Sequence, residues 1–192
     1  MRVFVTGASG FIGSAVTREL LDAGHEVLGL ARSDRSAEAV KAAGAEVHRG
    51  DLNDLDSLRR GAEAADGVAH LAFIHDFTNL TVSGEADLRA IDAVGEVLEG
   101  TGKPLVVTSG LLTAPGQVAT EEQPADPASP ARHRHASEFA TLALAERGVR
   151  ASVLRLPPSV HGEGDYGFVP MFIRPSFARG RGISPPSPIN RR

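Results

Sequence analysis

The stretch TGASGFIG, residues 6–13, follows a short apolar run at residues 2–5 and leads directly into a segment with helical spacing. In such a strand–turn–helix unit, Gly7 permits a tight turn, Gly10 lets the backbone approach a pyrophosphate, and Gly13 allows close packing of the helix on the sheet. The start of the helix adds amide donors and the positive end of its dipole. The stretch therefore predicts a nucleotide-binding loop; the alternative is a glycine-rich turn with a purely structural role.

Outward from this loop, short apolar runs alternate with longer segments of helical spacing, which is the pattern of parallel βαβ units. Strands are expected at residues 2–5, 26–30, 46–48, 67–71, 105–108 and 151–156. Helices are expected at residues 14–23, 37–43, 55–62, 85–99 and 137–146. The pattern predicts an α/β fold of the Rossmann type, with a doubly wound, mainly parallel sheet flanked by helices.

The alternation stops near residue 172. Residues 1–172 are expected to form one nucleotide-binding domain. Residues 173–192 are rich in proline and arginine, contain no acidic residue and show no periodicity, so we expect an irregular tail where a substrate-binding lobe would begin. A second aperiodic stretch, residues 114–130, is expected to be a long surface loop of the kind that often covers a binding site.

Composition excludes several functional classes. The chain of 192 residues has 42% hydrophobic residues and no cysteine, so it can bury a core but has no disulfides, thiolate nucleophiles or thiolate-bound metals. Its net charge of −4 argues against general nucleic-acid binding. The sequence shows no secretory signal or apolar run of membrane-spanning length, so we expect a cytoplasmic protein with no membrane association. No metal site is predicted.

Further motifs follow the glycine loop in a recognisable order: GDLND at residues 50–54, HLA at 70–72, VVTSG at 106–110 and RLPPSVHG at 155–162. With these motifs, residues 1–172 resemble the short-chain dehydrogenase/reductase superfamily, in particular its extended and atypical branches of the NAD-dependent epimerase/dehydratase type. The resemblance implies a bound NAD(P) molecule that lies along the ends of the strands.

The same resemblance implies which residues contact this cofactor. The glycine loop would hold the phosphates, Asp51 and Leu52 would contact the adenine, and residues 71–73 would lie over the adenine ribose and phosphates. Thr108 and Ser109 would lie under the nicotinamide ribose, and a proline-rich turn at residues 156–159 would lie near the nicotinamide. The full set of implied contacts, apart from those discussed next, is Gly7, Ser9, Gly10, Phe11, Ile12, Gly13, Asp51, Leu52, Leu71, Ala72, Phe73, Thr108, Ser109 and Pro157.

Charge at the end of the second strand predicts the choice of cofactor. An acidic residue there would bind the ribose hydroxyls of NAD, but this sequence has Ala31 followed by Arg32 and Ser33. Arg32 and the Ser33 hydroxyl can both bind a 2′-phosphate, so NADP is favoured over NAD. The alternative is that Arg32 is a solvated surface arginine beside Asp34.

Active members of the superfamily use a tyrosine and a lysine four residues later, and this pair is absent. The only tyrosine, Tyr166, is followed four positions later by Pro170, and neither Lys41 nor Lys103 lies four residues after a tyrosine. Since the pair acidifies the group that exchanges a proton with the substrate, the usual hydride-transfer machinery is missing.

Alignment of the helix at residues 137–146 places Pro130 at the tyrosine position and Arg134 at the lysine position, with Glu138 at the glutamate one turn later. The usual catalytic serine falls near Gly110, one residue after Ser109. An arginine at the lysine position can still bind the nicotinamide ribose, but its pKa is too high for proton exchange. Arg134 is therefore included among the predicted cofactor contacts.

Two groups of polar residues are candidates to replace the missing pair. His133 and His135 flank Arg134 where a histidine can act as general acid; the alternative for this run is a solvated basic helix start. Residues 161–166 after the last strand include His161 and Asp165, at a point where parallel sheets bind ligands; a glycine-rich turn explains them equally well.

These observations leave two functional hypotheses. One is a NAD(P)(H)-binding oxidoreductase, or an epimerase or dehydratase, that acts on an unidentified small molecule with non-standard catalytic residues. The other is a non-catalytic NADPH-binding sensor or interaction module; a damaged fragment is a third alternative. The resemblance also implies a homodimer formed through the helices at residues 85–99 and 137–146.

Overall fold

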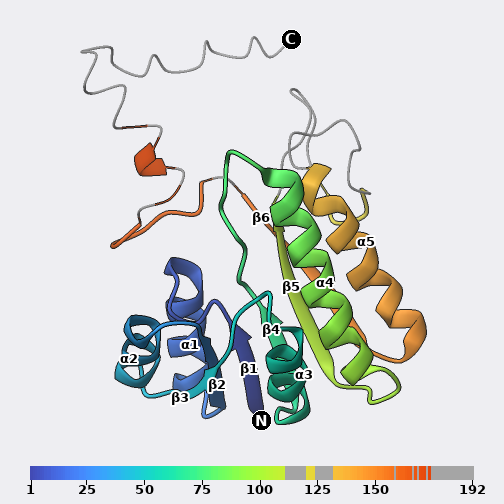
Figure 1. The fold of residues 1–192 in the computed structure, drawn as a ribbon, viewed down its shortest axis with the longest axis horizontal. Helices are drawn as coiled ribbons and strands as arrows, with labels where there is room; N and C mark the ends of the chain where they lie inside the picture. The colour runs from blue at the N-terminus through green and yellow to red at the C-terminus, as the bar shows by residue number, and fades with distance from the viewer. Residues whose placement is uncertain are drawn as a thin grey trace. The chain divides into compact units, whose positions relative to one another are not determined.

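Six strands form one sheet in the order β3-β2-β1-β4-β5-β6. All five neighbouring pairs are parallel, which confirms the predicted Rossmann-type fold (Figure 1). The strands are β1 Arg2–Thr6, β2 Glu26–Ala31, β3 Glu46–Arg49, β4 Gly67–His70, β5 Pro104–Gly110 and β6 Arg150–Leu156. Each contains the residues predicted for it, except that Leu71 lies just beyond β4.

Polar capping residues or tight turns precede the first four helices. They are α1 Phe11–Asp22, α2 Asp34–Ala42, α3 Leu55–Glu63, α4 Leu80–Leu98 and α5 His135–Ala143, with the 3-10 helices η1 Arg132–Arg134 and η2 Leu144–Arg147. Helix α4 begins at Leu80 rather than near residue 85, because Asn79 accepts a hydrogen bond from the Val82 amide and caps the helix. Its first turn has no apolar periodicity, so the sequence pattern missed it.

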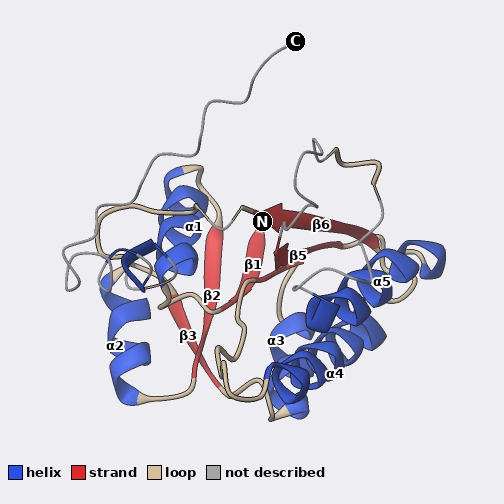
Figure 2. Cartoon of the chain, turned by 90° about the horizontal axis from the view of Figure 1, so that it is seen from above, coloured by secondary structure: helices blue, strands red, loops and turns tan. Residues whose placement is uncertain are grey.

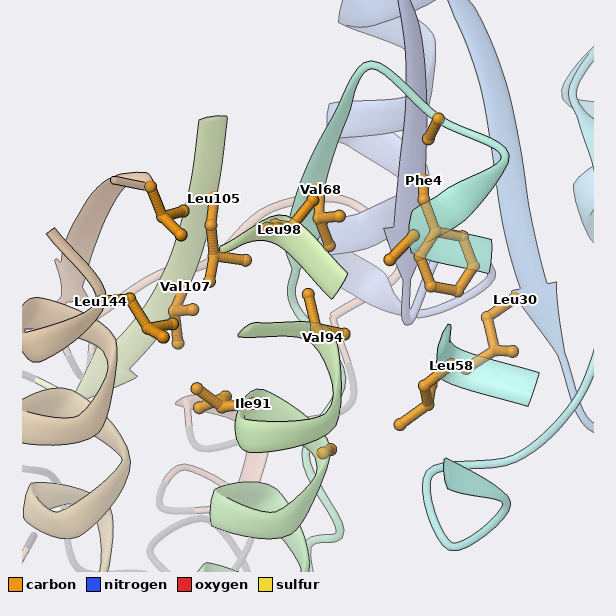
Figure 3. Packing of buried hydrophobic residues seen from close by; sticks show 14 of the residues in the cluster. Phe4, Leu30, Leu58, Val68, Ile91, Val94, Leu98, Leu105, Val107 and Leu144 are labelled. Atoms are coloured by element: carbon orange, nitrogen blue, oxygen red, sulfur yellow. The ribbon is translucent and has the colours of Figure 1, made fainter. Parts of the chain in front are cut away.

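The helices cover both faces of the sheet (Figure 2). On one face, side chains of α1 and α2 pack with Val5 and Val27 in a small apolar cluster. On the other face, α3, α4 and η2 contribute to a larger cluster around Phe4, which is fully buried (Figure 3). Burying a side chain of this size stabilises the fold by about 1.5–3 kcal/mol. The sheet is therefore covered on both faces, as parallel sheets require.

The computed structural model describes residues 1–110, 120–123, 132–157, 159–165, 167, 169–171 and 173. The residues form two compact units, Met1–Pro157 and Pro158–Arg192. Predictions for Pro130, Tyr166 and the tail lie outside the described residues, and the division at residue 172 stays a prediction. Within the described part of the chain, no helix has both the length and the apolar character needed to cross a membrane.

Candidate functional site

The predicted cofactor contacts gather at one edge of the sheet. Because every strand is parallel, the residues that follow the strands all lie at their carboxyl ends: the glycine loop after β1, Arg32 after β2, Asp51 after β3, residues 71–73 after β4 and Pro157 after β6. The order of the strands reverses between β1 and β4. Such a switch point opens a crevice at the carboxyl edge, where ligands bind in this architecture.

The glycine loop is shaped by close backbone approaches. Gly7 has a φ of 74°, and a Cβ atom placed on it would lie 2.9 Å from the Ala72 amide nitrogen. A Cβ atom on Gly13 would lie 2.0 Å from the Gly7 carbonyl oxygen. Only glycine fits at both positions, so the loop folds tightly against the residues after β4. Gly10 donates from its amide to the Gly7 carbonyl at 2.8 Å and closes the turn.

The start of α1 differs from the starts of the next three helices. Ser33, Asp54 and Asn79 cap α2, α3 and α4 with side-chain oxygens. At α1 the cap residue is Gly10, which has no side chain to offer, and Phe11 and Ile12 form the first turn after the exposed Ser9. No side chain caps these amides, so they fit the phosphates of a nucleotide.

Arg32 and Ser33 follow β2 at the position that discriminates between NAD and NADP. Arg32 is exposed and has no ion-pair partner among the residues that the structure describes, because Asp34 pairs instead with Arg49 at 2.5 Å. The Ser33 hydroxyl accepts the Ser36 amide at 3.2 Å as the cap of α2. The arginine is therefore available to an anion, whereas the serine already has a structural partner.

Asp51 and Leu52 follow β3. Leu52 is 9% exposed and belongs to the larger apolar cluster. The Oδ1 atom of Asp51 accepts from the Asn53 amide at 2.9 Å and from Asn53 Nδ2 at 3.1 Å. These two bonds stabilise the turn that leads into α3, and Asp51 Oδ2 takes no part in them. The predicted contact between Asp51 and adenine stays a prediction.

A buried polar cluster of Thr6, His70, Asp87 and Arg134 links the strand ends to η1. The Thr6 Oγ1 atom accepts the Leu71 and Ala72 amides at 3.1 and 3.2 Å and lies 3.1 Å from His70 Nδ1. With two donors already directed at its oxygen, the Thr6 hydroxyl donates to Nδ1. The proton of a neutral His70 ring is then on Nε2, which lies 3.2 Å from Asp87 Oδ1 and donates to it.

Arg134 completes this cluster. It is 7% exposed; its Nη1 lies 3.3 Å from Asp87 Oδ1, and its Nη2 donates to the Thr108 carbonyl. The guanidinium carbon lies 4.1 Å from the centroid of the Phe73 ring. The interpretation of a solvated basic helix start is therefore wrong for Arg134, because an acid, a carbonyl and an aromatic face surround it.

The electrostatics of the cluster favour a charged pair. Burial alone would raise the pKa of Asp87, but the hydrogen bond from His70, the attraction of that ring when it is protonated and the charge of Arg134 hold the pKa below its ordinary value. Burial lowers the pKa of Arg134, and Asp87 opposes that effect. Asp87 Oδ2 and Arg134 Nη1 are buried without a hydrogen-bond partner in the described part of the chain, and the Ser137 hydroxyl lies close enough to Asp87 to help lower its pKa. The cluster thus retains hydrogen-bonding capacity that an ordered water or a ligand can use.

An aromatic cluster of Phe73, His75 and Phe77 lies beside the buried polar cluster. The His75 ring meets the Phe73 ring edge-on, with 5.2 Å between centroids, and lies 6.1 Å from the Phe77 ring. The His133 ring is 5.9 Å from Phe73. Phe73 therefore contacts Arg134 and both histidines, which places these groups together at the end of β4.

The remaining candidates are distributed as follows. Thr108 and Ser109 are 7% and 6% exposed at the end of β5, and Pro157 is exposed after β6. Glu138 is buried and accepts from Arg155 Nη2 at 2.5 Å, which ties α5 to β6. In the second unit, His161 Nδ1 lies 2.8 Å from Asp165 Oδ2.

A cavity of about 370 Å³ opens between the starts of α4 and α5. Its lining consists of Leu80, Thr81, Gly84, Glu85, Leu88, Arg132, His133 and Ala136. It shares His133 with the surroundings of Phe73 but includes none of the glycine loop. In the described ranges, no three His, Asp or Glu side chains are placed to hold a metal ion.

Sequence reasoning missed Asp87 and His75. Asp87 lies four residues before Ile91 and seven before Val94, on the buried face of α4. An acidic residue at apolar helical spacing was therefore a signal that it needs a buried partner. His75 stands between Phe73 and Phe77 in a segment without periodicity, and nothing in that pattern indicates that the three rings cluster.

Comparison with known proteins places this architecture in a family. Residues 3–181 match the model of the NAD dependent epimerase/dehydratase family. The chain belongs to this family. The resemblance to the extended short-chain dehydrogenases/reductases is thereby confirmed.

Two relatives of this epimerase/dehydratase chain are fungal. The uncharacterized protein C2A9.02 of Schizosaccharomyces pombe is 50% identical over 188 residues, which cover 96% of this chain and 62% of the relative. The uncharacterized protein YLL056C of Saccharomyces cerevisiae is 47% identical over 184 residues, 94% of this chain and 61% of the relative. The chain thus spans less than two thirds of the length of either relative.

Among solved structures of the family, the UDP-glucose 4-epimerase of Thermus thermophilus in complex with NAD superposes with a TM-score of 0.69. It is 27% identical, and the match covers 95% of this chain and 64% of that protein. This likeness supports a nicotinamide cofactor for the family member described here.

Proposed function

We propose that this chain binds NADP(H) at the carboxyl edge of its sheet and serves as the coenzyme-binding part of an oxidoreductase with non-standard catalytic residues. The observation that carries the proposal is the start of α1, where the loop from Gly7 to Gly13 exposes amides that no side chain caps. The nicotinamide would supply or accept a hydride. The chain holds the phosphates at α1 and directs the other end of the cofactor toward β4 and β5.

The preference for NADP rests on Arg32. This side chain is exposed at the end of β2 with no described ion-pair partner, since Asp34 binds Arg49 at 2.5 Å. No acid occupies the preceding position, Ala31. An arginine without an acidic neighbour to neutralise it attracts a 2′-phosphate and leaves the ribose hydroxyls of NAD without a carboxylate partner.

Fluorescence titration with NADPH and NADH tests the cofactor site. We expect NADPH to bind more tightly, and Arg32→Ala to weaken NADPH binding about tenfold while NADH binding is unchanged, because one charge-assisted contact is lost. Arg18→Ala, an exposed arginine on α1, is the matched control. Equal affinities for the two nucleotides would remove the NADP preference, and no binding of either would remove the proposed function.

A second candidate function is a non-catalytic NADPH-binding sensor. It is favoured by Arg134, which stands at the lysine position yet is buried and bound to Asp87 and Thr108. A guanidinium in that state does not exchange a proton. Oxidation of NADPH with a panel of aldehydes and ketones separates the two functions: tight binding without turnover supports the sensor, and turnover supports the oxidoreductase.

We also propose that the protein is cytoplasmic, acts on a small molecule and forms a homodimer through α4 and α5. Support for the dimer comes from apolar side chains at the surface of these helices: Val82, Phe139 and Leu142 are 52%, 50% and 45% exposed. Such residues favour an interface when they lie together. Light scattering of the protein and of Phe139→Glu tests the dimer, with a monomeric variant expected.

A further inference from the structure

We propose that His75 is the general acid–base residue of this site and takes the place of the missing tyrosine. This inference rests on the proposed function, because a proton donor or acceptor has a role only where a hydride is transferred. It differs from the two histidines that the sequence offered as candidates, His133 in η1 and His135 at the start of α5. The support comes from the position of His75, its neighbours and its ionisation.

The position of His75 is set by the segment between β4 and α4. Figure 1 shows this segment leading from the carboxyl edge of the sheet to the start of α4. His75 is exposed on it, and its ring contacts the edge of Phe73. Phe73 also contacts the His133 ring and the guanidinium of Arg134, and Arg134 donates to the Thr108 carbonyl at the end of β5. His75 is therefore one aromatic ring away from the residues predicted to lie at the nicotinamide ribose.

Arg134 supplies charge at this place but cannot exchange a proton. Its guanidinium stays protonated, and its contacts with Asp87, Thr108 and Phe73 hold it in the interior. An imidazole does exchange protons near neutral pH. The two side chains thus share the roles that the tyrosine and lysine have in active members of the superfamily. Arg134 provides the fixed positive charge, and His75 provides the proton.

The surroundings lower the pKa of His75 and so favour the neutral form of its ring. Neighbouring groups shield part of the ring from water and lower its pKa, the charge of Arg134 lowers it further, and a backbone hydrogen bond with Phe73 opposes both. The adjacent carboxylate does not reverse this effect, because Asp76 Oδ1 accepts instead from the Thr78 amide at 2.9 Å and the Thr78 hydroxyl at 2.6 Å. In the described part of the chain, His133 and Arg134 are the further titratable groups beside the Phe73 ring.

A neutral imidazole is suited to act as a base. A bound oxidised nicotinamide would accept the hydride. When the substrate is an alcohol, a ring nitrogen of His75 would take the hydroxyl proton as the hydride leaves the same carbon, which would leave a carbonyl and an imidazolium. In the opposite direction the imidazolium returns the proton to the carbonyl oxygen as the hydride arrives at the carbon. Protons and electrons balance in both directions with no further reactant.

Histidine NMR tests this placement without a known substrate. The nicotinamide of NADP⁺ carries a positive charge that NADPH lacks, so a ring next to it should titrate differently in the two complexes. We expect the pKa of His75 to be lower with saturating NADP⁺ than with NADPH by about one pH unit. His25, which precedes β2 at the opposite edge of the sheet, is the internal control and should titrate equally in both.

The outcomes separate the two proposals. If both nucleotides bind and His75 titrates identically in the two complexes, His75 is not at the nicotinamide and this inference is overturned while the cofactor site stands. If neither nucleotide binds, the proposed function fails and the inference falls with it. A response confined to His133 or His135 would move the role to that residue and would also overturn the assignment to His75.

Substitution gives a second, kinetic arm wherever a carbonyl of the panel is reduced. His75→Ala should lower kcat about 10²–10⁴-fold with little change in the Kd of NADPH, as expected for removal of a general acid. His25→Ala is the matched control and should retain kcat. His75→Ala removes the ring contacts with Phe73 and Phe77, so an unchanged melting temperature must show that the fold is intact. A kcat of His75→Ala within threefold of the parent protein would contradict the inference.

Discussion

The two ends of the carboxyl edge are built in different ways. At β1 the site consists of backbone: a turn at Gly7, a close approach at Gly13 and amides at the start of α1. At β4 and β5 it consists of buried side chains, with Asp87 and Arg134 joined to His70 and Phe73. Backbone geometry follows from a local pattern of glycines. The buried polar cluster instead requires four segments far apart in the chain to meet.

Because the two ends are built differently, different substitutions should disrupt them. A backbone site fails when an added atom occupies the space that glycine leaves open. A buried ionic site fails when one member is removed, because its partner is left charged in a medium that does not solvate it. The predictions below compare these two kinds of failure, from the largest expected effect to the smallest.

Removal of Asp87 should have the largest effect. Asp87→Ala leaves Arg134 buried without its acid, and we expect a loss of about 3–5 kcal/mol in the free energy of unfolding, measured by urea denaturation. The double substitution Asp87→Ala with Arg134→Met should recover part of this loss, since no unpaired charge then remains. A loss below about 1 kcal/mol in Asp87→Ala would show that the pair is solvated.

Gly13→Ala should come next. Its Cβ atom would lie 2.0 Å from the Gly7 carbonyl oxygen, so the loop must move. We expect this movement to lower the free energy of unfolding by about 1–3 kcal/mol. Because the loop also binds the phosphates, NADPH affinity should fall with it. Gly110→Ala is the control for stability, since a Cβ atom there meets nothing within 4 Å. Equal stability of the two variants would mean that α1 can shift freely on the sheet.

Lowering the pH should destabilise the β4–β5 end of the site by protonating Asp87. The pKa of Asp87 is lower in the folded protein than its ordinary value, so its contribution is complete above the ordinary pKa of about 4 and is lost as pH falls through the folded pKa. We expect the unfolding free energy to decline below about pH 4, and to decline less steeply in Asp87→Asn. Parallel pH profiles for the two proteins would assign the decline to other carboxylates.

The smallest effect should come from a surface ion pair. Arg2 Nη2 lies 2.7 Å from Glu46 Oε2, with side chains that are 33% and 64% exposed. Solvent screens this pair, so Glu46→Gln should change the unfolding free energy by about 0.5 kcal/mol or less. A change comparable to that of Asp87→Ala would show that exposure does not govern the strength of ion pairs in this protein.

Much of the fold was predictable because its signals are local. Strands such as Glu26–Ala31 are short apolar runs, and the turn at Gly7 and the cap at Asp54 depend only on nearby residues. The first turn of α4 was missed because Asn79 caps it before any apolar repeat begins. The positions of the implied cofactor contacts at the carboxyl edge follow from parallel pairing, which the alternation of strands and helices predicted.

The sequence by itself determined the Rossmann architecture, the glycine loop and the loss of the tyrosine–lysine pair, since each depends on residue identity and short spacing. Tertiary structure alone decided that Arg134 is buried, that Asp87 on α4 is its partner and that His75 meets Phe73. These contacts join residues that are far apart in sequence or lie in an aperiodic segment. The physical reason is that burial and pairing of charge depend on what surrounds a side chain in space, and no local pattern encodes that.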